Sequence, residues 1–327
     1  MIARRRAILA ISFTAILWGL PSLFIHYFTR YFDADTQNFW RYLSALAFLY
    51  LYGWWSGETT ICRDRRALVR ILVAAIMLIT YQVCFTSSLY RAMPALVSLL
   101  IQIELVAAIV LSCLFFPDER RVARSPWFLL GASAALAGAV GMVVFSRGFA
   151  AHGTPGEAWN NLAIAVALVV GAAVLWAGYS VAIKWCLAVA PPFSAFTSVA
   201  TMATVTFLLF SATRGTIGAI LQTPPLVVLA IFLSGIGCIA IAQILYVRAI
   251  QQLGVSVCNT VILTSPIVAA VASRFLFSER LTRWQVLSAA VLLAGAAAAI
   301  QAQNRRRTVS PPAGNAVENT GQDALLR

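Results

Sequence analysis

The stretch YQVCFTSSL at residues 81–89 returns 161 positions later as AQILYVRAI at residues 242–250, so that Gln82 corresponds to Gln243 and Phe85 to Tyr246. A second pair, WFLLGASAALAG at residues 127–138 and WQVLSAAVLLAG at residues 284–295, is offset by 157. Self-similarity at a nearly constant spacing indicates an internal repeat. The chain therefore consists of two halves that share one order of segments.

The composition indicates an integral membrane protein. Hydrophobic residues make up 61% of the 327 residues and charged residues only 11%, whereas roughly a quarter of the residues in soluble domains are charged. The formal net charge of +13 comes from basic residues that stand singly or in threes between apolar runs, which indicates membrane topology rather than a nucleic-acid-binding face. We therefore expect the lipid bilayer, and no nucleic acid, as a partner.

Windows long enough to cross a bilayer, about 20 apolar residues each, can be placed ten times along the chain. They fall at residues 7–28, 38–56, 68–90, 94–115, 126–146, 160–186, 194–212, 225–249, 254–275 and 284–303. The sequence thus predicts an all-α polytopic membrane protein with ten transmembrane helices in two five-helix repeats. Because five is odd, the second repeat must enter the bilayer from the opposite side, so the repeats are predicted to be inverted.

The domain organisation follows from these windows. We expect a first repeat at residues 1–147, a connecting loop at 148–159, a second repeat at 160–303 and a disordered cytoplasmic tail at 304–327. If the N-terminus is cytoplasmic, fifteen Arg and Lys residues lie on that side and eight on the other. The excess predicts a multi-pass protein with both termini in the cytoplasm.

Cysteine and histidine give no sign of a cofactor. The six cysteines are scattered without a CxxC pair, and neither histidine stands at ligand spacing. Cysteine inside an apolar run behaves as a small hydrophobic residue. We expect no metal site, no cofactor and no catalytic residue.

Four stretches of the chain carry a family pattern, in this order: LWG at 17–19, SLYRAMPALVSLLIQIELVAAIV at 88–110, LWAGYSVAIK at 175–184 and YVRAIQQLGVSVCNTVILTSPIVAAVASRFLFSERLTRWQ at 246–285. Together they resemble the drug/metabolite transporter superfamily, EamA type, over nearly all of residues 10–303. The resemblance implies a ten-helix carrier of the cell inner membrane with cytoplasmic termini, commonly an exporter of amino acids, metabolites or drugs.

The sequence departs from that family in the fourth window. The family often has Glu-Pro-Val there, whereas this chain has Glu104, Leu105 and Val106; the second half keeps its proline, Pro266, beside Ser265. Whether the fourth helix is broken in the first repeat is therefore left open by the sequence.

Glu104 is the foremost candidate for a role in transport. It lies about ten residues, or roughly 15 Å, into its window, near the middle of the bilayer. A carboxylate there is costly, which favours a role in proton coupling or in recognition of a substrate amine. The alternative is a protonated or hydrogen-bonded glutamate that closes a helix contact.

Two amides and two aromatic rings form a second candidate set. Gln82 and Gln243 lie at equivalent depths, and Phe85 and Tyr246 follow them by three residues on the same helix face. If these four side chains converge, they suit a small amphipathic solute. The alternative is that each Gln links two helices and that the rings fill the core.

Four further residues complete the predicted pathway. Trp18 and Trp176 occupy matching places in the first helix of each half, and Tyr179 follows Trp176 by one turn, so all three are candidates to line a cavity. Arg41 could attract an anionic group of a substrate, but snorkelling to the headgroups is the favoured interpretation.

The residues favour a secondary transporter that exports a small organic solute, an amino acid or related metabolite or drug, by alternating access, with protons as a candidate coupling ion. No GxxxxGK[ST] motif supports ATP-driven transport. The alternatives are an uptake permease for a small metabolite and, less favoured, a membrane-embedded enzyme or a structural protein. Small residues in the windows at 126–146 and 284–303 predict a scaffold or a dimer surface, so a monomer and a homodimer both remain open.

Overall fold

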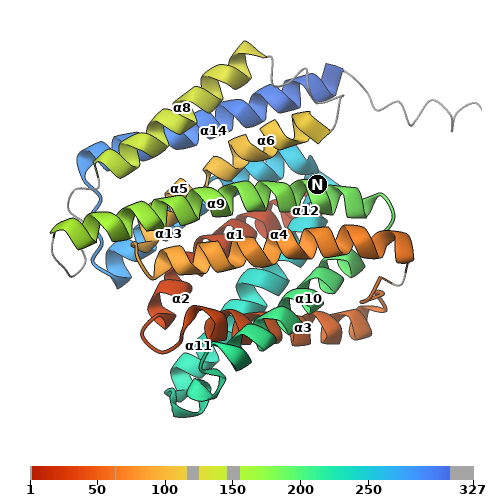
Figure 1. Cartoon of the computed structure of the whole chain (residues 1–327). Coiled ribbons are helices and arrows are strands. Elements are labelled where there is room, and N and C mark those ends of the chain that lie inside the picture. The colour runs from red at the N-terminus through yellow and green to blue at the C-terminus, as the bar shows by residue number, and fades with distance from the viewer. Residues whose placement is uncertain (1, 63, 116–124, 146–154, 310–327) are drawn as a thin grey trace, which may run out of the picture.

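The computed structural model describes residues 2–62, 64–115, 125–145 and 155–309 (Figure 1). Within these residues the chain is helical and contains no strand. The elements are α1 (Ile2–Gly19), α2 (Pro21–Phe28), α3 (Ala34–Ser56), α4 (Arg65–Leu89), α5 (Pro94–Leu100), α6 (Ile103–Phe115), α8 (Pro126–Val144), α9 (Pro155–Leu187), α10 (Pro192–Thr213), the 3-10 helix η2 (Ile217–Gln222), α11 (Pro225–Gly235), the π-helix η3 (Ile236–Ile241), α12 (Ala242–Ile262), α13 (Ser265–Leu276) and α14 (Arg283–Val309).

Seven helices in the described part of the chain are long and apolar enough to cross a membrane, which makes this a multi-pass membrane protein. They are Arg5–Phe28, Ala67–Leu89, Pro126–Val144, Trp159–Leu187, Pro192–Thr213, Pro225–Ala249 and Arg283–Gln301. Ten continuous spans are not found in the described residues. The window at 38–56 lies in α3, which is long but carries buried polar side chains, and the windows at 94–115 and 254–275 are each divided between two helices.

Three predicted boundaries also differ. The turn expected between residues 249 and 254 is wrong, because α12 is continuous from Ala242 to Ile262. Gly254 lies within it, and a single glycine weakens a helix without ending it. α9 begins inside the predicted connecting loop and α14 runs six residues past 303. The rest of the predicted loop and tail, at 148–154 and 310–327, lies outside the described residues.

Proline marks the beginnings of many helices. Six helices have it as their first residue, namely Pro21, Pro94, Pro126, Pro155, Pro192 and Pro225. The missing N–H of proline costs nothing there, because the first N–H groups of a helix have no intrahelical acceptor. α3 begins instead with a capping carboxylate, since Asp33 accepts the N–H of Thr36 at 2.8 Å.

Two helices are interrupted at equivalent points of the repeats. α5 and α6 are separated at residues 101–102, and α12 and α13 at residues 263–264. Pro266 explains the second break, because proline lacks an N–H and clashes with the preceding turn. The first break occurs without proline: the N–H of Glu104 donates to the carbonyl of Ile101 at 2.9 Å, which is a three-residue turn. The break that the sequence left open is therefore present.

The third helix of the second repeat contains a further irregularity that the third helix of the first repeat does not share within the described residues. The π-helix η3 joins α11 to α12, whereas the corresponding helix of the first repeat, α4, is a regular α-helix. Gly235 directly precedes η3, and a Cβ atom there would collide with the Arg41 carbonyl oxygen and with Ser44 of α3. Glycine thus lets α11 approach α3 closely at the point where the helix geometry changes.

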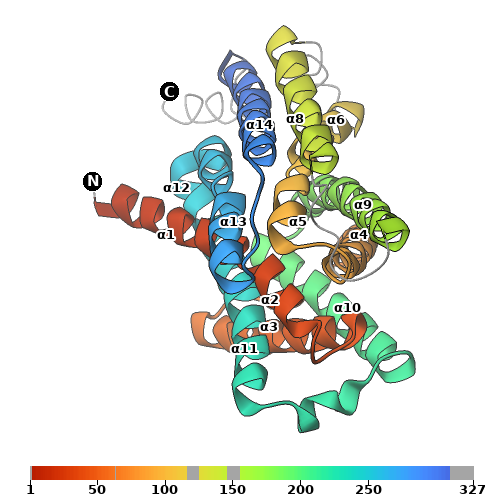
Figure 2. The same ribbon diagram turned by 90° about the vertical axis from the view of Figure 1, so that its left-hand side faces the viewer.

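The helices of the two halves pack in reciprocal pairs. α8 lies along α14 and α3 along α10, which pairs the fifth and second helices of one half with their own counterparts (Figure 1 and Figure 2). α1 packs on α12 and α9 on α4, so that the first helix of each half meets the third helix of the other. Exchange of the halves leaves this set of pairs unchanged. Such reciprocity is what a two-fold relation between repeats produces.

Small residues are used in the contact between α8 and α14. A Cβ on Gly138 would lie 2.6 Å from the carbonyl oxygen of Ser288, and a Cβ on Gly131 would lie 2.8 Å from that of Gly295. Close approach of backbones is the usual role of small residues in membrane helices. These stripes therefore form an internal scaffold, while large side chains such as Leu130 remain exposed on α8.

Candidate functional site

The end of α1 touches both irregular segments of the second repeat. A Cβ on Gly19 would lie 2.6 Å from the carbonyl oxygen of Ser265, which begins α13, and a Cβ on Gly237, in η3, would lie 3.6 Å from Leu17. α1 itself gives way to α2 at Leu20. Irregular backbone at membrane depth is tolerated where protein buries it or where it lines a cavity. The point where α1, η3 and α13 meet is thus a candidate position for a functional site.

Glu104 lies in the first turn of α6, directly after the break in the fourth window. Its side chain is partly buried, and no residue that the structure describes forms a hydrogen bond with it. Its charge acts on Tyr81 of α4 and on Tyr246 of α12, one from each half. The partial positive charge of a helix N-terminus favours a carboxylate at this position. No group of three or more His, Cys, Asp or Glu that could hold a metal occurs in the described residues.

Aromatic rings gather where the first and third helices of opposite halves cross. Trp18 and Tyr246 have ring centroids 4.9 Å apart, and on the other side Trp176 lies 4.8 Å from Tyr81. Phe85 stacks on Tyr81 at 5.6 Å. These distances are those of favourable aromatic pairs. Trp18, Trp176, Phe85 and Tyr246 are thus brought into two related aromatic clusters.

Tyr179 joins the second cluster, with its ring 5.2 Å from that of Trp176. Tyr81 is the member of this cluster that sequence reasoning missed. Its counterpart at the repeat spacing is Ala242, so a comparison of the two halves gave it no weight. Its position one helical turn before Phe85 was the available signal.

Gln82 is held in a polar network between α3 and α4. Its amide nitrogen donates to Asn38 at 3.2 Å and to Thr86 at 3.0 Å, and the Tyr42 hydroxyl donates to its carbonyl oxygen at 3.5 Å. Gln243 is partly buried on α12, directly after η3. No hydrogen bond joins the two amides within the described residues. These hydrogen bonds agree with the alternative interpretation, in which Gln82 links two helices, because its side chain bonds to α3 and to its own helix α4.

Arg41 does not snorkel to the headgroups. Its side chain is only 2% exposed and is among the largest fully buried side chains of the described residues. The Nε–H donates to the Ser234 hydroxyl of α11 at 3.2 Å, while Nη1 has no hydrogen-bond acceptor. The interpretation of Arg41 as an interfacial residue is therefore wrong, because the crossing of α3 with α11 encloses the guanidinium.

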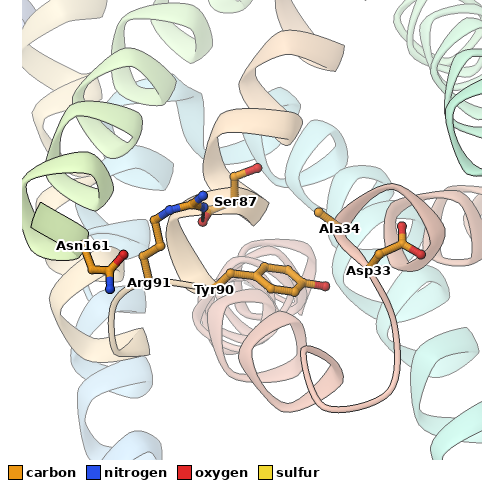
Figure 3. Close-up of a pocket in the computed structure, with 6 residues that line it drawn as sticks. All are labelled: Asp33, Ala34, Ser87, Tyr90, Arg91 and Asn161. Atoms are coloured by element: carbon orange, nitrogen blue, oxygen red, sulfur yellow. Dashed lines mark hydrogen bonds between the residues drawn. The ribbon is translucent and has the colours of Figure 1, made fainter. Parts of the chain in front are cut away.

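A groove of about 550 Å³ opens near one end of the bundle, where the start of α3, the end of α4 and the beginning of α9 meet (Figure 3). Its lining residues are Asp33, Ala34, Ser87, Tyr90, Arg91 and Asn161. None of the nine predicted pathway residues lines it. The Tyr90 hydroxyl is already engaged, since it donates to the Phe32 carbonyl and accepts from Gln37, each at 2.6 Å.

Asp33 connects the two halves at this end. Besides capping α3, its carboxylate accepts both the N–H and the hydroxyl of Thr216, each at 2.8 Å, from the loop that follows α10. Burial alone would raise the pKa of Asp33, but the hydrogen bonds from Thr36 and Thr216 outweigh it, so the pKa lies below its usual value. The ionised carboxylate thus stabilises this contact between repeats.

Glu279 makes a second contact between the halves. From the loop after α13, its carboxylate accepts the N–H of Ala95 at 3.0 Å and the hydroxyl of Ser273, so it caps α5 of the first repeat. Burial raises the pKa of Glu279, and these hydrogen bonds offset only part of the rise.

Comparison with solved structures shows that the fold is a known one. A chain titled "Crystal structure of protein" matches with a TM-score of 0.61 and 20% sequence identity, over 92% of this chain and 97% of that chain. Its likeness concerns the fold alone. No curated protein matches the chain. The EamA-like transporter family matches it twice, at residues 5–144 and 163–301, which corresponds to one match in each half. Because the two matches cover most of its length, the chain belongs to the EamA-like transporter family.

Proposed function

We propose that this membrane transporter is a secondary carrier that exports a small organic solute, an amino acid or related metabolite or drug, by alternating access. The observation that carries the proposal is the position of Glu104. It stands at the N-terminus of a half-helix, partly accessible, and within the electrostatic reach of Tyr81 and Tyr246, one from the aromatic cluster of each half. Discontinuous helices that meet near the bilayer midplane form the substrate and ion sites of many carriers.

The pairing of the helices supports an inverted relation between the repeats. The reciprocal contacts of α1 with α12 and of α4 with α9 are those expected of halves related by a two-fold axis. Five predicted spans in each half place that axis in the membrane plane, because the second half must begin on the opposite side. A carrier with such symmetry can expose one site to each side in turn.

The chemistry of the centre suits an amphipathic solute. The carboxylate of Glu104 can attract a cationic group or bind a proton, and the rings of Trp18, Tyr81 and Tyr246 can contact an apolar body. Isolation of the carboxylate from any hydrogen-bond donor in the described residues leaves it available to a ligand. Proton coupling through Glu104 forms part of this proposal.

Orientation and location rest on the distribution of charge. The excess of Arg and Lys on one side of the predicted spans favours cytoplasmic termini and, with the family, the cell inner membrane. Uptake by the same mechanism is the alternative to export, because the direction depends on the coupled gradient and not on the position of the site.

Counterflow in proteoliposomes tests the proposal. Vesicles loaded with each unlabelled member of a panel of amino acids and organic cations should accumulate the same labelled solute, and the recovered solute should be chemically unchanged. Glu104→Gln should abolish the pH dependence of this flux, whereas Glu58→Gln, at an exposed residue after α3, should leave it intact. Absence of counterflow for the entire panel would refute the carrier, and conversion of a solute would favour the membrane-embedded enzyme.

A further inference from the structure

Arg41 brings a charge into the bundle without a partner of opposite sign. It forms no ion pair with an acidic residue in the part of the chain that the structure describes, and its charge acts on Tyr42, Tyr81 and Cys238. Charged side chains at membrane depth are costly and mark pathways for ions or substrates unless a counter-charge compensates them. No residue in the described ranges supplies such a counter-charge at Arg41, which points to an anionic group of a ligand.

Other unsatisfied polar groups stand beside this guanidinium. The side chains of Gln37 and Asn38 are both completely buried on α3, four and three residues before Arg41, and therefore on neighbouring positions of the same face. Asn38 Nδ2 and Arg41 Nη1 are donors without acceptors. A buried donor without an acceptor is rare in native proteins. One of these two donors belongs to the uncompensated charge itself and the other to the amide beside it, and together they suit an oxyanion.

Ser234 of α11 fixes the orientation of the Arg41 guanidinium. The Ser234 hydroxyl accepts the Nε–H, and Ser234 in turn donates to the Ile231 carbonyl at 2.7 Å. The close approach of Gly235 and the adjacent π-helix, η3, hold α11 against α3. π-helical turns occur frequently at functional sites. Because Nε is already engaged, the Nη groups remain for a ligand.

We propose that Arg41, assisted by the Asn38 amide, binds the carboxylate of the transported solute. This inference rests on the proposed function and narrows it to solutes that carry a carboxylate. Tyr81 lies within the electrostatic reach of both Arg41 and Glu104. A solute that places its carboxylate at Arg41 can therefore present a cationic or neutral polar group to Glu104.

A matched series of solutes tests the carboxylate directly. Counterflow and thermal stabilisation are measured for L-phenylalanine, its carboxamide and phenethylamine, and for other amino acids with their carboxamides. The wild type should prefer the carboxylate over the carboxamide by about ten- to a hundred-fold, the range expected for charge-assisted hydrogen bonds to a guanidinium. Equal treatment of acid and amide by the wild type would overturn the proposal, whatever the variants do.

Substitutions then assign the preference to Arg41. In Arg41→Gln the ratio of acid to amide should fall to near one, and Arg41→Lys should restore part of it, because lysine keeps the charge without the planar fork. The control Arg274→Gln, at an exposed residue of α13, should keep the wild-type ratio. An unchanged ratio in Arg41→Gln would refute the assignment.

The two proposals fail in different ways. Counterflow of amides and amines with no carboxylate preference would leave the carrier standing and remove the Arg41 subsite. Carboxylate-specific thermal stabilisation that depends on Arg41, without any counterflow, would keep the subsite and remove the carrier.

Discussion

Replacement of Asp33 by asparagine should loosen the contact between the two repeats at the groove end of the bundle. Asparagine keeps one oxygen, which can still cap α3 by accepting the N–H of Thr36. The other oxygen becomes an amide nitrogen, which cannot accept the N–H and hydroxyl of Thr216. The substitution therefore removes both bonds from Asp33 to the second repeat and spares the helix cap, while the Thr36 hydroxyl still accepts the Thr216 N–H at 3.1 Å.

The expected cost follows from these two hydrogen bonds. Each bond to a charged acceptor contributes about 1.5–3 kcal/mol when it is shielded from water. Because Asp33 is only partly buried, solvent screening reduces their joint contribution to about 2 kcal/mol. That value corresponds to a roughly 30-fold increase in the population in which this contact is open.

Hydrogen exchange of the Thr216 amide in lipid nanodiscs measures this population, since that N–H is one of the two Thr216 groups that donate to Asp33. Exchange should accelerate roughly 30-fold in Asp33→Asn by the same conversion. Asp35→Asn is the matched control, because Asp35 only approaches the exposed Arg214 at 3.9 Å, and such a pair contributes little. Unchanged exchange in Asp33→Asn, or equal acceleration in Asp35→Asn, would refute the reasoning.

Three further predictions concern pH and stability. Because hydrogen bonds lower the pKa of Asp33, protection of the Thr216 amide should be complete above the usual aspartate pKa of about 3.9 and should disappear as the pH falls through the lowered value. Exchange corrected for its intrinsic pH dependence should show this loss in the wild type and not in Asp33→Asn. Gly138→Ala should lower the melting temperature, since its Cβ meets rigid backbone of α14 at a cost of about 1–3 kcal/mol, whereas Gly171→Ala, with nothing within 4 Å, should raise it; the opposite order would contradict the packing. Glu279→Gln should change thermal stability little, because burial already raises the pKa of Glu279 and glutamine keeps an acceptor for Ala95, while Glu279→Leu should cost about 1–3 kcal/mol. Equal losses in both variants would disprove the capping role.

Much of the fold could be predicted because its causes are local. Apolar windows and the spacing of the two copies predicted where most helices lie, and Trp18 and Trp176, which occupy matching places in the sequence, lie in related aromatic clusters. The break before Glu104 could not be predicted, because no proline causes it and its backbone turns form only in the packed structure. The continuity of α12 was missed for the converse reason, since Gly254 and the polar residues before it resemble a loop in sequence and are accommodated within a helix.

The candidate site was predictable in its types of residue and less so in their partners. Glu104 is partly buried in the first turn of α6, and its role in transport stays a prediction. The Gln82 amide donates to Asn38 on α3 and to Thr86 on the next turn of α4. Which polar partner it finds depends on how the helices are rotated about their axes, and sequence periodicity does not specify this. The burial of Arg41 depends on the close approach of Gly235, a contact between residues almost 200 positions apart in sequence that no local pattern contains.

The central claim is that one site between the repeats is reached from each side in turn. Gln243, partly buried beside η3, is suited to test it as Gln243→Cys in a chain whose native cysteines are replaced by alanine. In oriented proteoliposomes, a membrane-impermeant thiol reagent added on either side should label this cysteine, and a solute that shows counterflow should slow labelling from both sides. Labelling from one side only, unaffected by any transported solute, would contradict alternating access.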